Sequence, residues 1–147
     1  MKQDSEANHV KILVNTPTED GYPPEEWESL WAIPLCASLF KIDSIPFFAK
    51  GLSCDDVIAA TFEADAFIFC EVITPSDNST VRVCVFDLAK VVEIRTALYE
   101  IGCESEGSGI PGLFALNIPQ NCKDQAYEIL RTAALDEKLD YEEGAVR

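Results

Sequence analysis

The chain has 147 residues, of which 48% are hydrophobic, and it carries 26 Asp and Glu against 11 Lys and Arg, a formal net charge of −15. A field this negative repels nucleic acid and anionic membranes and speeds encounter with basic surfaces, so we expect neither a nucleic acid nor a membrane as partner. The hydrophobic content is sufficient for a folded core. The polar start lacks the apolar run of a signal peptide, and no stretch approaches a membrane span, which predicts a cytoplasmic protein.

The first half of the chain predicts a flexible tail, residues 1–8, followed by a series of short strands. Residues 9–15 alternate as a strand does. Residues 16–26 hold three prolines, one glycine and four acids, which is typical of a loop. Further strands are predicted at 28–35, 39–42, 46–49, 58–62 and 66–73. Many short strands with few helical patterns favour a barrel-like subdomain over residues 9–76.

The second half alternates between strand and helix patterns. Strands are predicted at 80–86, 103–106, 113–118 and 139–146. Helices are predicted at 88–101, capped by Asp87, and from a cap at Asn121 to residue 133. The order βαββαβ is that of a ferredoxin-like unit, here over residues 77–146. The expected fold class is therefore α+β, with a β-rich barrel-like N-terminal half packed on a ferredoxin-like C-terminal half.

Residues 107–112 read Gly-Ser-Gly-Ile-Pro-Gly and match the glycine spacing of dinucleotide-binding loops. Such a loop needs a strand before it and a helix after it, so that backbone N–H groups point at the pyrophosphate. Here a helix and an acidic segment precede the glycines, a strand follows them, and Pro111 removes a donor. The pattern therefore predicts a hairpin turn and no bound cofactor.

The sequence predicts no catalytic or metal site. The lone histidine, His9, is expected to be an exposed residue of a loose chain end. The six cysteines lie 14 to 19 residues apart without a Cys-x-x-Cys pair, which favours reduced thiols over zinc or disulfides, with Cys70 and Cys84 buried in strands. A carboxylate-based enzyme would need two acids, such as Glu63 and Asp65, to converge in a deep pocket. Solvated acids are the simpler expectation.

The acidic loop around Tyr22 and Trp27 is the most informative segment. Pro23-Pro24 stiffen it, and aromatic anchors beside charges on a rigid segment are what protein interfaces favour. The competing interpretation is a solvated loop whose two rings tuck into the core. A second acidic stretch covers residues 136–143. The candidate partner-binding residues are Asp20, Tyr22, Glu25, Glu26, Trp27 and Glu28, followed by Asp55 and Asp56.

Four segments of the sequence form a pattern that can be compared with known families. They are 20–35 (DGYPPEEWESLWAIPL), 42–53 (IDSIPFFAKGLS), 78–83 (NSTVRV) and 102–108 (GCESEGS). Together they resemble a widespread bacterial family labelled as a domain of unknown function, over roughly residues 10–143. That family has Gly-Asp where this chain has Asp55-Asp56, and a glycine-containing turn near Cys36-Ala37. Its members include known or suspected immunity proteins, encoded beside secreted antibacterial toxins.

The resemblance implies a non-enzymatic immunity protein. Such a protein binds a cognate toxin with a basic cleft, as a monomer in a 1:1 complex, and occludes its active or target-binding site through an acidic surface. The alternative is a small-molecule-binding or regulatory module. In that case Phe40, Phe47, Phe48, Phe67 and Phe69 would line a pocket, and ordinary core packing of these rings is the competing interpretation.

Overall fold

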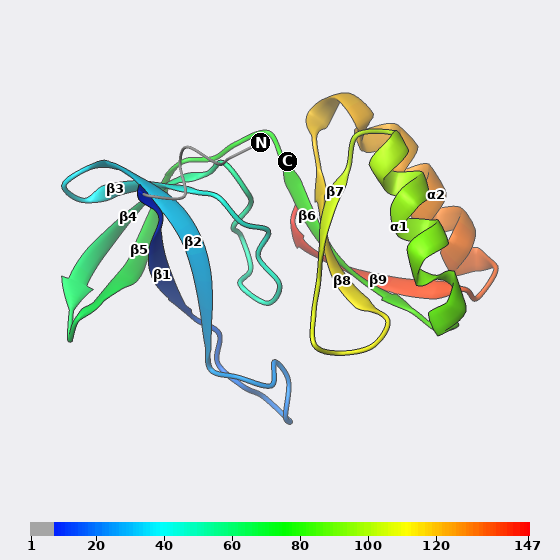
Figure 1. Ribbon diagram of the computed structural model, residues 1–147, viewed down its shortest axis with the longest axis horizontal. Coiled ribbons are helices and arrows are strands. Elements are labelled where there is room, and N and C mark those ends of the chain that lie inside the picture. The colour runs from blue at the N-terminus through cyan, green and yellow to red at the C-terminus, as the bar shows by residue number, and fades with distance from the viewer. Residues whose placement is uncertain (1–7) are drawn as a thin grey trace. The chain divides into compact units, whose positions relative to one another are not determined.

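The computed structural model describes residues 8–147, and the chain divides into two compact units between Ser76 and Asp77 (Figure 1). Residues 8–147 contain two α-helices and two mostly antiparallel sheets, and strands predominate, so the expected α+β class is confirmed. The expected tail lies outside the described residues, apart from its last residue. Within residues 8–147, neither helix has the length and apolar character needed to cross a bilayer.

The first unit is a five-stranded closed barrel. Its strands are β1 (Val10–Asn15), β2 (Trp27–Cys36), β3 (Leu39–Ile42), β4 (Val57–Glu63) and β5 (Ala66–Thr74). Neighbouring strands are antiparallel except β1 and β5, whose parallel pairing closes the barrel. Alternate side chains point inward. They form a core of Ile12, Val14, Leu30, Ala32, Phe40, Ile42, Ile58 and Ala60, against which Phe67 and Phe69 pack.

Residues 46–49, predicted as a strand, form a loop instead. The carboxylate of Glu28 accepts hydrogen bonds from the backbone N–H groups of Phe47, Phe48 and Ala49. These donors therefore point at a side chain of β2 and not at a neighbouring strand. The apolar pattern of the segment arises from burial in a loop and not from a sheet: Ala49 is 2% exposed, and Ile45, which precedes the segment, is 6% exposed.

His9 is not the exposed chain-end residue that the sequence predicted. Only 12% of its side chain is exposed, and its Nε2 lies 2.5 Å from Oδ2 of Asp43. Its ring also contacts the ring of Trp31 edge-on, with the centroids 6.0 Å apart. Because β1 pairs with β2 from Val10 onward, the preceding residue is held beside β2 rather than left in solvent.

The second unit is a four-stranded sheet covered on one face by two helices (Figure 1). Its strands are β6 (Ser79–Val85), β7 (Glu104–Gly107), β8 (Leu113–Ile118) and β9 (Leu139–Ala145). The order is β7-β8-β6-β9, and all neighbours are antiparallel. The helices are α1 (Val91–Glu100) and α2 (Lys123–Leu135). The core between the layers contains Val81, Val83, Leu98, Phe114, Leu116, Ile118, Ala126 and Leu130.

Three local predictions in this unit have different outcomes. Asp87 is a cap as predicted, because its Oδ1 accepts a hydrogen bond from Ala89 N in the 3₁₀ turn that leads into α1. The predicted cap at Asn121 is wrong, since that residue lies inside a 3₁₀ turn and makes no capping hydrogen bond. The glycine-rich segment 107–112 begins with the last residue of β7, and its residues 108–112 connect β7 to β8 as a turn. Gly112 has φ +82°, and a Cβ there would lie 2.6 Å from the carbonyl oxygen of Val85, so only glycine fits.

The six cysteines are free thiols in this structure, and the burial of two of them differs from the prediction. Cys54, Cys103 and Cys122 are buried, whereas Cys36, Cys70 and Cys84 are exposed. Strand alternation turns Cys70 and Cys84 away from the cores, because their neighbours in the strands point inward. The Sγ atoms of Cys103 and Cys122 lie 3.4 Å apart. Burial, together with the hydrogen bond to Cys122, raises the pKa of Cys103 to about 12.

We therefore expect thiol reagents to separate two classes of cysteine. The thiolate is the reactive species, so at pH 8 the exposed Cys84 is expected to be alkylated in the native protein. Cys103 is expected to react only after unfolding. Alkylation with iodoacetamide in native buffer, then with an isotopically labelled reagent in urea, followed by peptide mass spectrometry, measures both classes. Native alkylation of Cys103 as fast as that of Cys84 would contradict this packing.

Candidate functional site

A hairpin extension between β1 and β2, residues 16–26, carries half of the predicted partner-binding residues, and Trp27 and Glu28 follow it at the start of β2. Its turn is Asp20-Gly21, with φ values of 54° and 81°. The flanking residues Glu19 and Tyr22 exchange backbone hydrogen bonds of 2.9 and 3.0 Å. Two positive φ values in a two-residue turn are the type I′ geometry that Asp-Gly favours. The hairpin, blue in Figure 1, extends beyond the barrel strands.

The base of this hairpin is fixed by hydrogen bonds from Asn15, the last residue of β1, and from Thr16, which follows it. Thr16 donates its N–H to the carbonyl of Glu26 at 2.7 Å and its Oγ1 hydroxyl to the carbonyl of Glu25 at 2.9 Å. The side-chain amide of Asn15 also donates to the carbonyl of Glu26, at 3.2 Å. The backbone of Glu25 and Glu26 is thus held by hydrogen bonds, while both residues are exposed.

Aromatic side chains flank the acids of the hairpin. Tyr22 and Trp27 are 47% and 49% exposed. The ring of Tyr22 rests edge-on against Phe48, with the centroids 5.5 Å apart. We call the exposed side chains of Asp20, Tyr22, Glu25, Glu26 and Trp27 the hairpin surface. It combines rigid backbone, negative charge and apolar area, which is an arrangement suited to binding.

Trp31 extends this surface and was not among the predicted site residues. It lies on β2 four residues after Trp27, so both point outward, while Leu30 between them is buried. Trp31 is 47% exposed, and the Nζ of Lys11 lies 5.1 Å from its ring centroid. The alternation of side chains along β2 could have identified Trp31 from the sequence, because residues four apart in a strand lie on the same face.

Two predicted contact residues also hold the fold together. Glu28 accepts three backbone hydrogen bonds from residues 47–49, at 2.6, 2.9 and 2.8 Å. Asp56 is fully buried and accepts hydrogen bonds from Ser53 N at 2.9 Å and Ser76 N at 2.8 Å. Asp56, with no exposed surface, is not presented to a partner, which corrects the expectation for that residue. Glu28 is partly buried, and its contact with a partner stays a prediction.

The remaining candidate acids lie in other segments. Asp55 is exposed in the turn before β4, with φ +72° and the Nζ of Lys41 at 3.8 Å. Glu63 and Asp65 are both exposed at the connection between β4 and β5. Across residues 8–147, His, Cys, Asp and Glu side chains do not gather in threes as metal ligands would. The hairpin surface is therefore the strongest candidate site.

Comparison with known proteins gives a fold and a family. No curated protein matches the chain. The structure is similar to the crystal structure of a hypothetical protein from Neisseria gonorrhoeae, with a TM-score of 0.77 and 22% sequence identity over 93% of this chain and 94% of that one. At this identity the likeness shows the fold alone.

The model of a family described as a domain of unknown function, DUF4265, matches residues 28–139, well over half of the chain. The match begins at Glu28, the second residue of β2, and ends at Leu139, the first residue of β9, so it includes Trp31 but neither Trp27 nor the hairpin at residues 16–26. It confirms the expected kind of family, whose description states no activity. The chain therefore belongs to the DUF4265 family.

Proposed function

We propose that this protein is an immunity protein that binds a cognate antibacterial toxin and occludes the toxin's active or target-binding site. The observation that carries the proposal is the hairpin surface. Residues 16–27 contain four acids and no base, on backbone fixed by hydrogen bonds, with two half-exposed rings, Tyr22 and Trp27. A rigid segment loses little entropy on binding. The protein acts in the cytoplasm as a monomer in a 1:1 complex and catalyses no reaction.

Charges and rings have different roles in this proposal. The acids speed encounter with a basic cleft, and their effect weakens with salt because the Debye length at physiological ionic strength is only about 8 Å. The rings provide affinity once buried, since a few aromatic anchors carry most of the binding energy of an interface. Trp27, about half exposed, still has a large area to bury and is the expected anchor.

The proposed arrangement of the fold is a barrel-like half and a ferredoxin-like half. The closure of β1 on β5 supports the first interpretation. The strand order β7-β8-β6-β9, with α1 after β6 and α2 after β8, supports the second, because split βαβ units place each pair of helix-linked strands on either side of a third. The acidic hairpin belongs to the first half.

Replacing Trp27 with Ala is expected to weaken toxin binding by about 30-fold or more, mainly through faster dissociation. The double variant Glu25→Gln/Glu26→Gln is expected to slow association several-fold at low salt and little at high salt. Both are measured by surface plasmon resonance with the product of the adjacent gene, obtained by coexpression. Phe62→Ala is the matched control, because Phe62 is an exposed ring of the same unit outside the hairpin surface.

Two outcomes would overturn different parts of this proposal. If the two proteins fail to copurify and the toxin still kills cells that express this protein, the function is wrong. If they copurify but Trp27→Ala binds no worse than Phe62→Ala, the function stands and the hairpin surface is not the interface.

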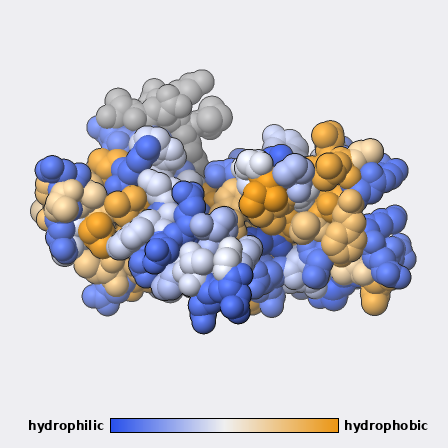
Figure 2. Space-filling model, turned by 90° about the horizontal axis from the view of Figure 1, so that it is seen from below, coloured by the Kyte–Doolittle hydropathy of each residue, from blue (hydrophilic) through white to orange (hydrophobic). Residues whose placement is uncertain are grey.

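The alternative function, binding of a small molecule, is supported by a groove between α1 and α2. Its volume is about 410 Å³, within the range of ligand pockets. Ile94, Ala97, Ile129 and Ala133 line it with Phe86, which is 57% exposed. Figure 2 shows hydrophobic surface (orange) on the second unit among hydrophilic residues. A compound that raises Tm in the native protein, but not in Ala133→Phe, would favour this function.

A further inference from the structure

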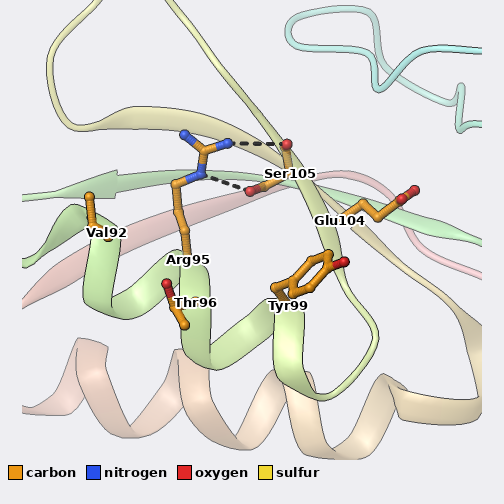
Figure 3. Close-up of a pocket in the computed structure, with 6 residues that line it drawn as sticks. All are labelled: Val92, Arg95, Thr96, Tyr99, Glu104 and Ser105. Atoms are coloured by element: carbon orange, nitrogen blue, oxygen red, sulfur yellow. Dashed lines mark hydrogen bonds between the residues drawn. The ribbon is translucent and has the colours of Figure 1, made fainter. Parts of the chain in front are cut away.

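A second groove lies between α1 and the strand β7, with a volume of about 380 Å³ (Figure 3). Val92, Arg95, Thr96 and Tyr99 line it from the helix, and Glu104 and Ser105 line it from the strand. β7 stands at the edge of its sheet and pairs with β8 on one side. Among the described strands none pairs with its other side, and such an edge is a template for an additional strand.

The backbone of Ser105 faces this open side. Arg95 donates from Nη2 to the carbonyl of Ser105 at 3.1 Å and from Nε to its hydroxyl at 2.8 Å (Figure 3). In an antiparallel ladder the N–H and C=O of one residue point to the same side. The N–H of Ser105 is therefore directed away from β8 as well. The carbonyl has two lone pairs, of which Arg95 uses one.

The side chains around the edge of β7 determine which residues of an added strand would make favourable contacts. Glu104 and Glu106 are both exposed and lie on the opposite face of β7 from Ser105, because side chains alternate along a strand. On the face of Ser105, α1 presents Val92 and Tyr99, which are 75% and 68% exposed. Residues of an added strand that lie opposite the two glutamates meet negative charge, and the residue between them meets apolar surface.

We propose that β7 binds an extended segment of another protein by strand addition, and that this segment carries basic residues at alternate positions with an apolar residue between them. Backbone hydrogen bonds to Ser105 hold the segment, and cross-strand pairs with Glu104 and Glu106 set its register. Arg95, whose guanidinium lies 5.5 Å from the ring centroid of Phe114, occupies the edge in the free protein and moves aside on binding. This surface belongs to the second unit and is independent of the hairpin surface.

The test uses the full-length protein and a capped peptide of alternating lysine and valine, with binding followed by calorimetry and by amide chemical shifts. The peptide is expected to shift the amide signals of Ser105 and Gly107. Two further peptides carry N-methyl groups on alternate backbone nitrogens, one on the odd-numbered residues and the other on the even-numbered residues. Each keeps the charge of the parent peptide and lacks the hydrogen-bond donors along one of its two edges. One of the two methylated peptides is expected to bind at least about tenfold more weakly, since one hydrogen bond is worth roughly that factor. Equal affinity of all three peptides would overturn the proposal.

Substitutions in the protein, in place of changes in the peptide, test the same interaction at the edge of β7. Ser105→Pro removes the outward N–H and is tolerated at a sheet edge, so it is expected to lose about tenfold in affinity. Ser105→Ala keeps that N–H and is expected to bind nearly as the native protein does. Arg95→Ala is expected to bind more tightly than Arg131→Ala, which removes the same charge from α2. A folded Ser105→Pro with native affinity would overturn the proposal, and if it does not fold, the methylated peptides decide.

Discussion

Replacing Asp56 with Ala is expected to destabilise the first unit by about 3–5 kcal/mol, because it removes a buried acceptor from two backbone donors. The carboxylate of Asp56 is fully buried, with Oδ2 at 2.9 Å from Ser53 N and Oδ1 at 2.8 Å from Ser76 N. Without it, both N–H groups lose their charged partner in a site that is poorly accessible to water. Each such loss costs about 1–3 kcal/mol.

The side chain of Asp56 joins the turn at Ser53 to Ser76, which is why its removal has so large an expected effect. Asp56 also accepts, through its backbone carbonyl, the N–H of Ile42 at 2.9 Å, a bond to the end of β3 that the Ala variant keeps. Its side chain closes the turn at Ser53 and reaches Ser76, the last residue of the unit. The hydroxyl of Ser76 in turn donates to the carbonyl of Cys54 at 2.8 Å. The loss of Asp56 therefore loosens the turn and the end of the unit together.

Urea unfolding followed by tryptophan fluorescence measures this effect, because both tryptophans of the chain, Trp27 and Trp31, lie in β2 of the first unit. The matched control is Asp55→Asn, the neighbouring acid, which is exposed and has φ +72°. Asn tolerates that conformation, so a change within about 0.5 kcal/mol is expected for the control. Equal unfolding midpoints for Asp56→Ala and Asp55→Asn would show that the buried carboxylate contributes little.

The two neighbouring aspartates also show where sequence reasoning ends. Asp55 and Asp56 have the same local pattern, yet one is exposed and the other is fully buried. The difference comes from Ser76, twenty residues away in the sequence, which no periodicity reports. The loop at residues 46–49 has the same origin, since its hydrogen-bond acceptor is Glu28 on a distant strand. Strands and helices, by contrast, were predictable because their periods are local.

The hairpin surface was predictable in outline for a similar reason. The Asp20-Gly21 pair signals a tight turn through its tolerance of positive φ, and the structure has that turn. Whether Tyr22 and Trp27 would be interface anchors or core residues was open in the sequence. The structure places each between the two, with about half of the residue exposed. Tyr22 is seated on Phe48, a contact that depends on how the loop at residues 46–49 is held.

Replacing Glu28 with Ala is expected to cost about 3 kcal/mol, since its carboxylate accepts three backbone hydrogen bonds and charge-assisted bonds of this kind are individually strong. Glu28→Gln is expected to lose less, because one of its two polar atoms still accepts while the amide nitrogen cannot. The control is Glu26→Gln, an exposed residue with the same charge change and a backbone held by Thr16. Urea unfolding followed by tryptophan fluorescence again gives the free energy of unfolding.

The same variant separates positioning from contact at the proposed interface. Oε1 of Glu28 holds the N–H of Phe48, and the ring of Phe48 supports Tyr22. Glu28→Gln is therefore expected to lower toxin affinity and stability together, and its effect on affinity is expected to be non-additive with Tyr22→Ala, because both act through one contact. A Glu28→Gln variant that is as stable as Glu26→Gln but deficient in binding would contradict a positioning role for Glu28. The carboxylate would then reach the partner directly, and the loop at residues 46–49 would not depend on it.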